Sequence, residues 1–330
     1  MSLKLGTTLY SLTNEFHGLE YGFADLIREV ASRNLGPGLE VVGFQSIRGF
    51  PEITPEFEKE FRGLIDETGL IPSCLGINAD VAIDRKSIAP VEEIVAYHER
   101  QILAAAKLGF PVVRYQFPAG ADAIRKLEPF AARHKVKLGL EIHAPATLET
   151  FHTAPFLEMY REVQSEWLGF IPDFGSTARA VPPTVINSFL EDGVACEAVD
   201  LALHFWSTEG DTHQRMTRFE QAAREAGVPE GHIIQLSIMF VLFGKLAPET
   251  WSEIMPQVVH IHGKCFDFDD HGDEVAVDYA RTLPVFLDGG FDGFMSSEYE
   301  GHIFSDEGAF AKIASHHALC RRIIEQHKVK

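Results

Sequence analysis

The chain has 330 residues, of which 45% are hydrophobic and 23% are charged, proportions that are typical of a globular protein with a substantial core. Its formal net charge of −19 gives a surface that repels phosphate backbones and anionic lipids, which argues against general nucleic-acid binding and membrane binding. The N-terminal sequence shows no signal-peptide pattern, and no apolar run reaches the roughly 20 residues of a membrane-spanning helix. These features predict a soluble, cytoplasmic protein.

The four cysteines are Cys74, Cys196, Cys265 and Cys320. Their spacing contains no CxxC pair and forms no disulfide framework. We expect all four to be buried as small apolar side chains, in keeping with a reducing compartment.

Short apolar runs that end in polar residues, glycine or proline alternate with helical patterns along the chain. Eight such runs predict β-strands, at residues 4–11, 38–44, 71–77, 111–117, 137–143, 168–173, 258–263 and 291–298. Helical periodicity is found at residues 21–34, 55–68, 91–108, 119–134, 156–167 and 306–326. Eight successive strand–helix units predict an α/β fold, specifically a (β/α)8 TIM barrel that forms one catalytic domain over residues 1–330.

A doubly wound open sheet is the structural alternative. That fold would place a GxGxxG segment after its first strand, but TTLYSLTNEF stands there. The closed barrel is therefore favoured.

The connection between the sixth and seventh strands, about residues 176–257, is far longer than usual. It contains helical runs around 184–205 and 213–226, followed by the apolar stretch IIQLSIMFVLFGKL at 233–246. We interpret it as a long helical insertion, either an enlarged loop that caps the barrel or a lid or subunit interface. The apolar stretch must be buried, which favours packing or a partner over exposure to solvent.

Acidic residues and histidines end four consecutive predicted strands, and catalytic residues of α/β barrels lie at these C-terminal ends. Residues two apart on a strand face the same side. Carboxylates together with an imidazole form a site for a divalent cation. Any one of these residues alone would be read as a packing, turn or capping residue. The set comprises Glu141, His143, Asp173, His260, His262, Lys264, Glu298 and Glu300.

The segments GLEIHAP, IPDFGS, HIHGK and SSEYEG resemble the xylose isomerase-like superfamily of sugar isomerases and epimerases, and the resemblance covers essentially the whole chain. It implies one metal ligand at the end of each of strands five to eight. In this sequence the ligands would be Glu141, Asp173, His262 and Glu298. His262 is preferred to His260 because the family's ligand precedes a lysine or equivalent residue by two positions, and Glu300 is the alternative to Glu298.

The resemblance implies a metal-dependent sugar isomerase or epimerase. Mn²⁺ is the expected cation, with Mg²⁺, Co²⁺ and Zn²⁺ as alternatives, and it would stabilise the enediolate formed when a proton beside a carbonyl is removed. His143 is the first candidate for the base because its ordinary pKa lies near neutrality. Glu141 or Glu298 could serve instead, and Lys264 would hold a substrate oxygen.

One departure points to a narrower alternative. Ser176 stands three residues after Asp173, where many family epimerases carry a histidine, while His143 lies two residues after Glu141. EIHAP, HGK and SSEYEG are similar to the catalytic subunit of bacterial C-glycoside deglycosidases, which cleave the carbon–carbon bond of 3-oxo-C-glycosides with a small β-rich partner subunit. This resemblance would make His143 a general acid/base and the insertion a partner or substrate surface.

Two other classes fit less well. An endonuclease IV-like nuclease needs more metal ligands and a basic face, which the net charge opposes. A non-catalytic binding barrel would leave the acidic residues dispersed. We expect a small sugar or sugar derivative as substrate, and either a second copy or a small subunit as partner. Aromatic residues near strand ends, either packing in the core or offering a platform for the sugar, are Tyr10, Phe44, Phe117 and Trp206.

Overall fold

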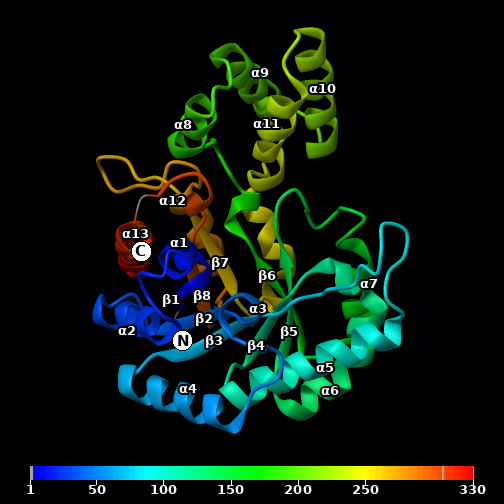
Figure 1. The fold of residues 1–330 in the computed structure, drawn as a ribbon, viewed down its shortest axis with the longest axis vertical. Helices are drawn as coiled ribbons and strands as arrows, with labels where there is room; N and C mark the ends of the chain where they lie inside the picture. Colours follow the sequence, from blue (N-terminus) through cyan, green and yellow to red (C-terminus); the bar gives the residue numbers. More distant parts are fainter. Residues whose placement is uncertain (1–2, 307, 330) are drawn as a thin grey trace.

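The computed structural model describes residues 3–306 and 308–329. Eight parallel strands form one sheet in the order β6-β5-β4-β3-β2-β1-β8-β7, with helices packed around them (Figure 1). Two isolated parallel bridges, Phe170 to Val258 and Asp173 to His262, connect the two ends of this order. The predicted TIM barrel is thereby confirmed. The strands are β1 (Lys4–Thr8), β2 (Gly38–Val42), β3 (Ile71–Gly76), β4 (Val112–Tyr115), β5 (Lys137–Ile142), β6 (Leu168–Pro172), β7 (Ile261–Cys265) and β8 (Phe294–Tyr299).

The helices around the barrel follow the strands in the chain. They are α1 (Thr13–His17), α2 (Phe23–Ser32), α3 (Gly43–Ser46), α4 (Pro55–Thr68), α5 (Val91–Leu108), α6 (Ala121–His134), α7 (Ala154–Val163), α12 (Tyr279–Asp288) and α13 (Ala309–Lys328). Short 3-10 helices are η1 (Leu9–Leu12), η2 (Phe117–Ala119), η3 (Phe174–Ser176), η4 (Pro248–Gln257) and η5 (Gly301–Ile303). Four of these, η1, η2, η3 and η5, begin within two residues of a strand end, at the rim where the strands finish.

Helix α4 shows how local sequence sets an element's bounds. The Thr54 side chain accepts a hydrogen bond from the Phe57 amide, and Pro55 occupies the first helical position, where its missing N–H costs nothing. Gly69 ends the helix with φ 68°, a left-handed conformation that favours glycine. The bounds predicted from sequence match this helix.

The segment between β6 and β7 holds four helices, α8 (Pro183–Glu191), α9 (Cys196–Ser207), α10 (Thr212–Glu225) and α11 (Glu230–Leu242). They stand together at the upper end of the molecule (Figure 1). The single helical run predicted over 184–205 is wrong, because Gly193 adopts φ 84° and separates α8 from α9. Cys196 begins α9 and is exposed, so the expectation that every cysteine is buried is also wrong.

The hydrophobic core falls into two clusters. The larger lies in the barrel and between its strands and helices. The smaller joins α8–α11 and includes Trp206 and Phe240, so the apolar stretch predicted at 233–246 is largely buried on one side of α11. Trp206 donates its indole N–H to the Phe243 carbonyl at 2.8 Å and therefore packs in this cluster instead of offering a platform at the rim.

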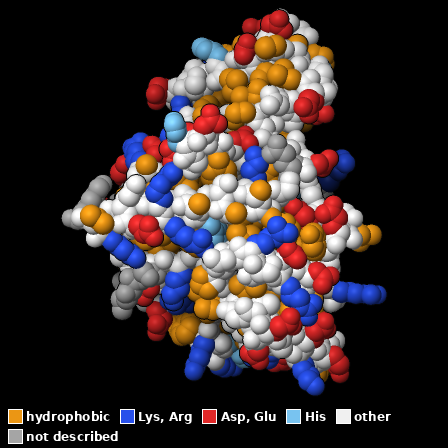
Figure 2. Space-filling model, turned by 90° about the vertical axis from the view of Figure 1, so that its left-hand side faces the viewer, with side chains coloured by type: hydrophobic (Ala, Val, Ile, Leu, Met, Phe, Trp, Pro, Cys, Tyr) orange, Lys and Arg blue, Asp and Glu red, His pale blue; other side chains and the backbone are white. Residues whose placement is uncertain are grey.

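The opposite side of α11 carries exposed apolar residues. Ile234, Ile238 and Val241 all face solvent, and hydrophobic side chains gather on the upper part of the surface that holds α8–α11 (Figure 2). Within the described part of the chain, no helix combines the length and the hydropathy that crossing a bilayer requires.

Candidate metal centre

The ends of β5 to β8 bring four possible metal ligands to one point inside the barrel. Glu141, Asp173, His262 and Glu298 each offer one ligand atom, and these atoms all lie within 4.8 Å of one another. All four side chains are buried. The structure therefore places the four residues that the sequence singled out close enough to share one cation.

The strand predicted at 258–263 begins and ends too early, since β7 spans Ile261–Cys265. Val258 and Val259 approach β6 before the regular ladder begins, and the Val259 amide donates to the Phe170 carbonyl at 3.0 Å. This shift places His262 and Lys264 inside the strand. Their alternation sends both side chains into the barrel.

Two carboxylate oxygens in the cluster are incompletely satisfied. Asp173 Oδ1 accepts a hydrogen bond from the Gly175 amide at 2.6 Å, but no hydrogen bond from the described residues reaches Asp173 Oδ2 or Glu298 Oε2. Buried carboxylate oxygens need a compensating charge. Three carboxylates and one imidazole form a donor set that suits a divalent cation, so these residues fit a metal ion.

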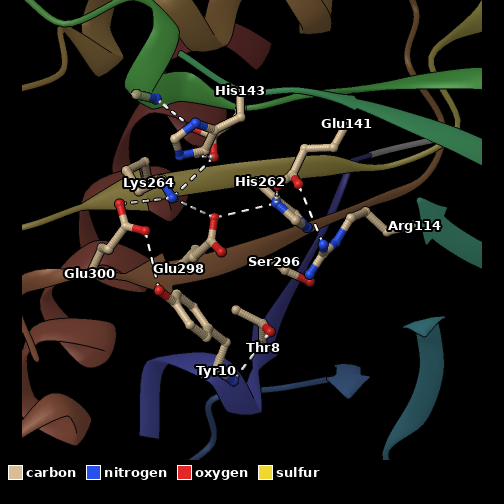
Figure 3. A network of polar contacts seen from close by, with 12 residues as sticks. Thr8, Tyr10, Arg114, Glu141, His143, His262, Lys264, Ser296, Glu298 and Glu300 are labelled. Atoms are coloured by element: carbon tan, nitrogen blue, oxygen red, sulfur yellow. Dashed lines mark hydrogen bonds and ion pairs between the residues drawn. The ribbon is translucent and has the colours of Figure 1, made fainter. Parts of the chain in front are cut away.

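Lys264 supplies positive charge to the same oxygens. Its Nζ lies 3.0 Å from Glu298 Oε2 and 3.1 Å from Glu300 Oε2 (Figure 3). It also lies 3.0 Å from Asp173 Oδ2. Burial alone would lower the pKa of Lys264, but the three carboxylates raise it well above its ordinary value. The ammonium group is therefore charged and lies at the edge of the ligand cluster.

The pKa of the Asp173 carboxyl is shifted in the opposite direction from that of Glu141. Burial of Asp173 raises the pKa of this carboxyl to about 6, against the opposing effect of Lys264. For Glu141, burial also acts upward, but Arg114 and His262 hold the pKa of that carboxyl well below its usual range. At neutral pH the cluster therefore carries ionised carboxylates ready to bind a cation.

His143 follows β5 and is the part of this group that reaches solvent, with a quarter of its side chain exposed. Its Nδ1 contacts the Ala144 carbonyl, which leaves Nε2 directed toward the cluster, 4.0 Å from Asp173 Oδ2. Burial would lower the pKa of His143, but the Asp173 carboxylate raises it. An accessible imidazole beside a buried cluster is placed to exchange a proton with a bound molecule.

The alternative ligands Glu300 and His260 and the aromatic candidate Phe117 lie outside the four-residue cluster. Glu300 contacts Lys264 and accepts a hydrogen bond from the Tyr10 hydroxyl at 3.4 Å. His260 is buried below the cluster, with Nε2 2.9 Å from Ser296 Oγ. Phe117 stacks on His152 with ring centroids 4.7 Å apart.

Sequence reasoning missed three contacts of the cluster. On β4, Arg114 Nη1 lies 3.5 Å from Glu141 Oε2, and Gln116, just after this strand, donates to the same oxygen at 3.2 Å. On β2, Glu40 Oε1 lies 3.0 Å from His262 Nε2. Glu40 left one signal in the sequence, because it is a lone acid within the apolar run GLEVVGF, and a charge in a buried strand requires a partner.

A cavity of about 760 Å³ lies beside this centre. One wall is the connection after β5, residues 145–152, which starts two residues beyond His143. Ser176, three residues after Asp173, and residues of α10 and α11, including Met216 and Phe240, form other parts of the lining. The cavity thus lies between the connection that follows β5 and the helices between β6 and β7, and the four clustered residues are not part of its lining.

Comparison with known proteins agrees with this architecture. Residues 37–318 match the family described as xylose isomerase-like TIM barrel. The 3'-dehydrocarminate deglycosidase alpha subunit of a Microbacterium species is 36% identical over 97% of this chain and 95% of its own length. The C-glycoside deglycosidase alpha subunit of Microbacterium trichothecenolyticum is also 36% identical, over 97% of this chain and 92% of its own length. The chain belongs to the xylose isomerase-like TIM barrel family.

Solved structures share the fold at much lower identity. A crystal structure of an IolI protein with a bound zinc atom superposes with a TM-score of 0.59 at 13% identity, and the match covers 98% of this chain and 99% of that one. The family-level expectation of a sugar-processing enzyme, stated from sequence, is therefore confirmed, and the narrower alternative agrees with the names of the relatives.

Proposed function

We propose that this chain is the catalytic subunit of a metal-dependent C-glycoside deglycosidase, forming one catalytic domain that cleaves the carbon–carbon bond between a 3-oxo sugar and its aglycone. The observation that carries the proposal is the accessible His143 imidazole beside a buried cluster of three carboxylates and one histidine. The names of the relatives, which match almost the whole chain, support it.

The ligands that we propose are Glu141, Asp173, His262 and Glu298, with Mn²⁺ as the first expectation because imidazole shifts preference toward Mn²⁺, Co²⁺ or Zn²⁺ and away from Mg²⁺. When bound, the cation would polarise the substrate carbonyl and compensate negative charge on its oxygen.

His143 performs the proton transfers in this proposal. Its Nε2 takes the proton from the sugar carbon that lies between the ketone and the anomeric carbon. The electron pair of that C–H bond forms a carbon–carbon double bond to the anomeric carbon, and the bond from the anomeric carbon to the aglycone breaks. The departing aglycone carbon then takes a proton, which the imidazolium of His143 can return. Lys264 orients a substrate oxygen, and Glu141 and Glu298 are the alternative bases.

The cavity beside the centre supports a substrate with a large apolar part. Its lining includes Leu148, Met216, Phe240 and Leu246, and apolar walls suit a flat aglycone. Because the relatives are named alpha subunits, we propose that the chain works with a small companion subunit in the cytoplasm, where its cysteines stay reduced.

The test is release of free aglycone from a 3-oxo-C-glycoside by the Mn²⁺-loaded protein, alone and mixed with a companion subunit of the named relatives. We expect aglycone and an unsaturated keto sugar in equal amounts. No release by wild type under both conditions would refute the proposal.

A sugar isomerase or epimerase is the second candidate. The ligand set of three carboxylates and one histidine is the one that the resemblance to sugar isomerases and epimerases implies. In such a reaction the enolised sugar is reprotonated without losing a substituent. A panel of ketoses and keto sugars, examined for exchange of the proton beside the carbonyl with deuterated water, separates the two. Exchange or epimer formation without aglycone release would favour this second candidate.

A further inference from the structure

Glu40 is a fully buried carboxylate on β2, with 0% of the residue exposed. Leu39 and Val41, its neighbours on the strand, belong to the hydrophobic core, so strand alternation turns Glu40 to the barrel interior. There its two oxygens meet two imidazoles of β7.

The two oxygens are divided between the two histidines. Oε1 lies 3.0 Å from His262 Nε2, and Oε2 lies 3.0 Å from His260 Nε2. The same His260 nitrogen lies 2.9 Å from Ser296 Oγ. A carboxylate only accepts hydrogen bonds, so each histidine places an N–H at Nε2 toward Glu40.

This pairing determines which nitrogen of His262 faces the ligand cluster. Its other ring nitrogen, Nδ1, lies 2.8 Å from Glu141 Oε1 and 3.3 Å from Glu298 Oε2, inside the ligand cluster. Histidines that bind metals commonly donate their second N–H to a carboxylate, which fixes the tautomer and the ring orientation and raises ligand basicity.

We infer that Glu40 is a positioning residue of the metal centre: it holds His262 as the Nε2–H tautomer and directs Nδ1 to the cation, while His260, which also contacts Ser296, anchors the second Glu40 oxygen. This inference rests on the proposed metal centre.

The same side chains raise a competing interpretation, since ligand atoms of Glu40, His260 and His262 also lie within 4.8 Å of one another. The two clusters differ in hydrogen bonding. In the Glu40 group, both carboxylate oxygens and both facing nitrogens are paired with one another. In the other cluster, Asp173 Oδ2 and Glu298 Oε2 accept no hydrogen bond from the described residues, although the Lys264 ammonium lies 3.0 Å from each of them. A hydrogen-bonded support therefore fits the Glu40 group better than a second ion.

The first experiment titrates Mn²⁺ into metal-free wild type and the Glu40→Gln variant, following free Mn²⁺ by electron paramagnetic resonance. Glutamine keeps the shape of Glu40, but its amide oxygen accepts from one histidine only and its NH₂ opposes the other N–H. We expect one ion per chain in both proteins, with Kd raised 10- to 100-fold in the variant. Thermal unfolding of each metal-free protein verifies folding.

Glu274→Gln is the matched control. Glu274 is equally buried, but it accepts hydrogen bonds from the backbone amides of Phe266 and Val277 and does not belong to the ligand cluster. We expect its Mn²⁺ affinity to equal that of wild type. A similar loss of affinity in both variants would show a general effect of replacing a buried acid and would overturn the inference.

A second readout needs no change at Glu40. In Zn²⁺-loaded wild type, long-range ¹H–¹⁵N correlations report the tautomer of His262. The signal of His262 is assigned as the one that disappears in the His262→Gln variant. We expect the proton at Nε2 and the metal at Nδ1. The reverse tautomer, an unchanged Kd in Glu40→Gln, or a second bound ion that only this variant loses would each overturn the inference. A wild type that binds no metal would instead refute the metal centre itself, and the inference with it.

Discussion

His143 Nε2 lies 4.0 Å from Asp173 Oδ2, so the most accessible imidazole of the centre faces its most deeply buried carboxylate. Asp173 is 0% exposed, whereas His143 reaches solvent. The two residues divide the work that the proposed reaction requires: one side chain binds inside the barrel, and the other meets the substrate.

Replacing His143 with asparagine should abolish proton transfer without emptying the site. General acid–base catalysis contributes typically 10²–10⁴-fold, so we expect kcat to fall by about that factor. Elemental analysis should find the same metal content as in wild type, because His143 is not among the four clustered ligands. Loss of metal together with activity would place His143 among the ligands and contradict its proposed role.

Removal of a ligand should have the opposite signature. In Glu298→Gln and His262→Ala, we expect metal content to drop from about one ion per chain toward zero, because four-ligand sites with the short bonds of Mn²⁺ or Zn²⁺ tolerate few losses. Glu300→Gln is the comparison, since Glu300 contacts Lys264 but is outside the ligand group. If Glu298→Gln retained its metal and Glu300→Gln lost it, Glu300 would be the ligand and Glu298 would not.

Lys264→Met should make the fold depend on metal. The substitution leaves three buried carboxylates without the ammonium that lies within 3.1 Å of each, and breaking such a buried ion pair costs about 3–5 kcal/mol. A bound cation would restore part of the compensation. We therefore expect Mn²⁺ to raise Tm more in the variant than in wild type, as measured by calorimetry.

Lys126→Met provides the control for this prediction. Lys126 pairs with Glu92 at 2.9 Å, but both side chains are more than half exposed, and surface pairs contribute at most about 1 kcal/mol. Its Tm and its response to Mn²⁺ should match wild type. An equal loss of Tm in both variants would show that the effect does not depend on the buried position of Lys264.

Acid should destabilise the protein through two buried histidines of α13. Burial lowers the pKa of His316 to about 3 and that of His317 to about 4, from an ordinary 6.5. The unfolded chain then binds more protons than the folded one, so stability falls as pH decreases below 6.5. Each histidine contributes a loss of about 2 kcal/mol between pH 6.5 and 5.

Urea unfolding at pH 7 and pH 5 measures this effect. In wild type, the Nε2–H of His317 donates to the Gly6 carbonyl at 3.1 Å, a bond that the amide of His317→Gln can replace without titrating. We expect a shallower pH dependence in this variant. An identical slope in both proteins would show that His317 does not titrate between these pH values.

Residue patterns predicted the barrel because each apolar run that forms a strand ends in polar residues, glycine or proline. The proposed ligands were accessible to the same reasoning, because position at a strand end places Glu141 and Glu298 on one rim in a barrel. Glu40 lies in mid-strand, and its role depends on β7 lying across the barrel from β2, a contact between residues 220 and more positions apart. Single-sequence patterns do not encode such a distance.

The insertion was harder to divide into helices. The apolar periodicity continues through residues 184–205, and the break depends on the backbone conformation of Gly193, with φ 84°. Cys196, just beyond it, is exposed because it opens α9 on the outer surface. Helical patterns specify the buried side of each helix, while the positions of the breaks are determined by tertiary packing.

The junction between β6 and β7 gives the proposed cation a mechanical role. Along the described chain these strands are joined by two isolated bridges, and one of them pairs Asp173 with His262, residues from the proposed ligand set. An ion bound by both residues would link the ends of β6 and β7, where the barrel closes without a regular ladder. Stripping it with a chelator should accelerate amide hydrogen exchange at β6 and β7 first, while β2 and β3, which are paired from Gly38 to Val42 on the far side, keep their protection.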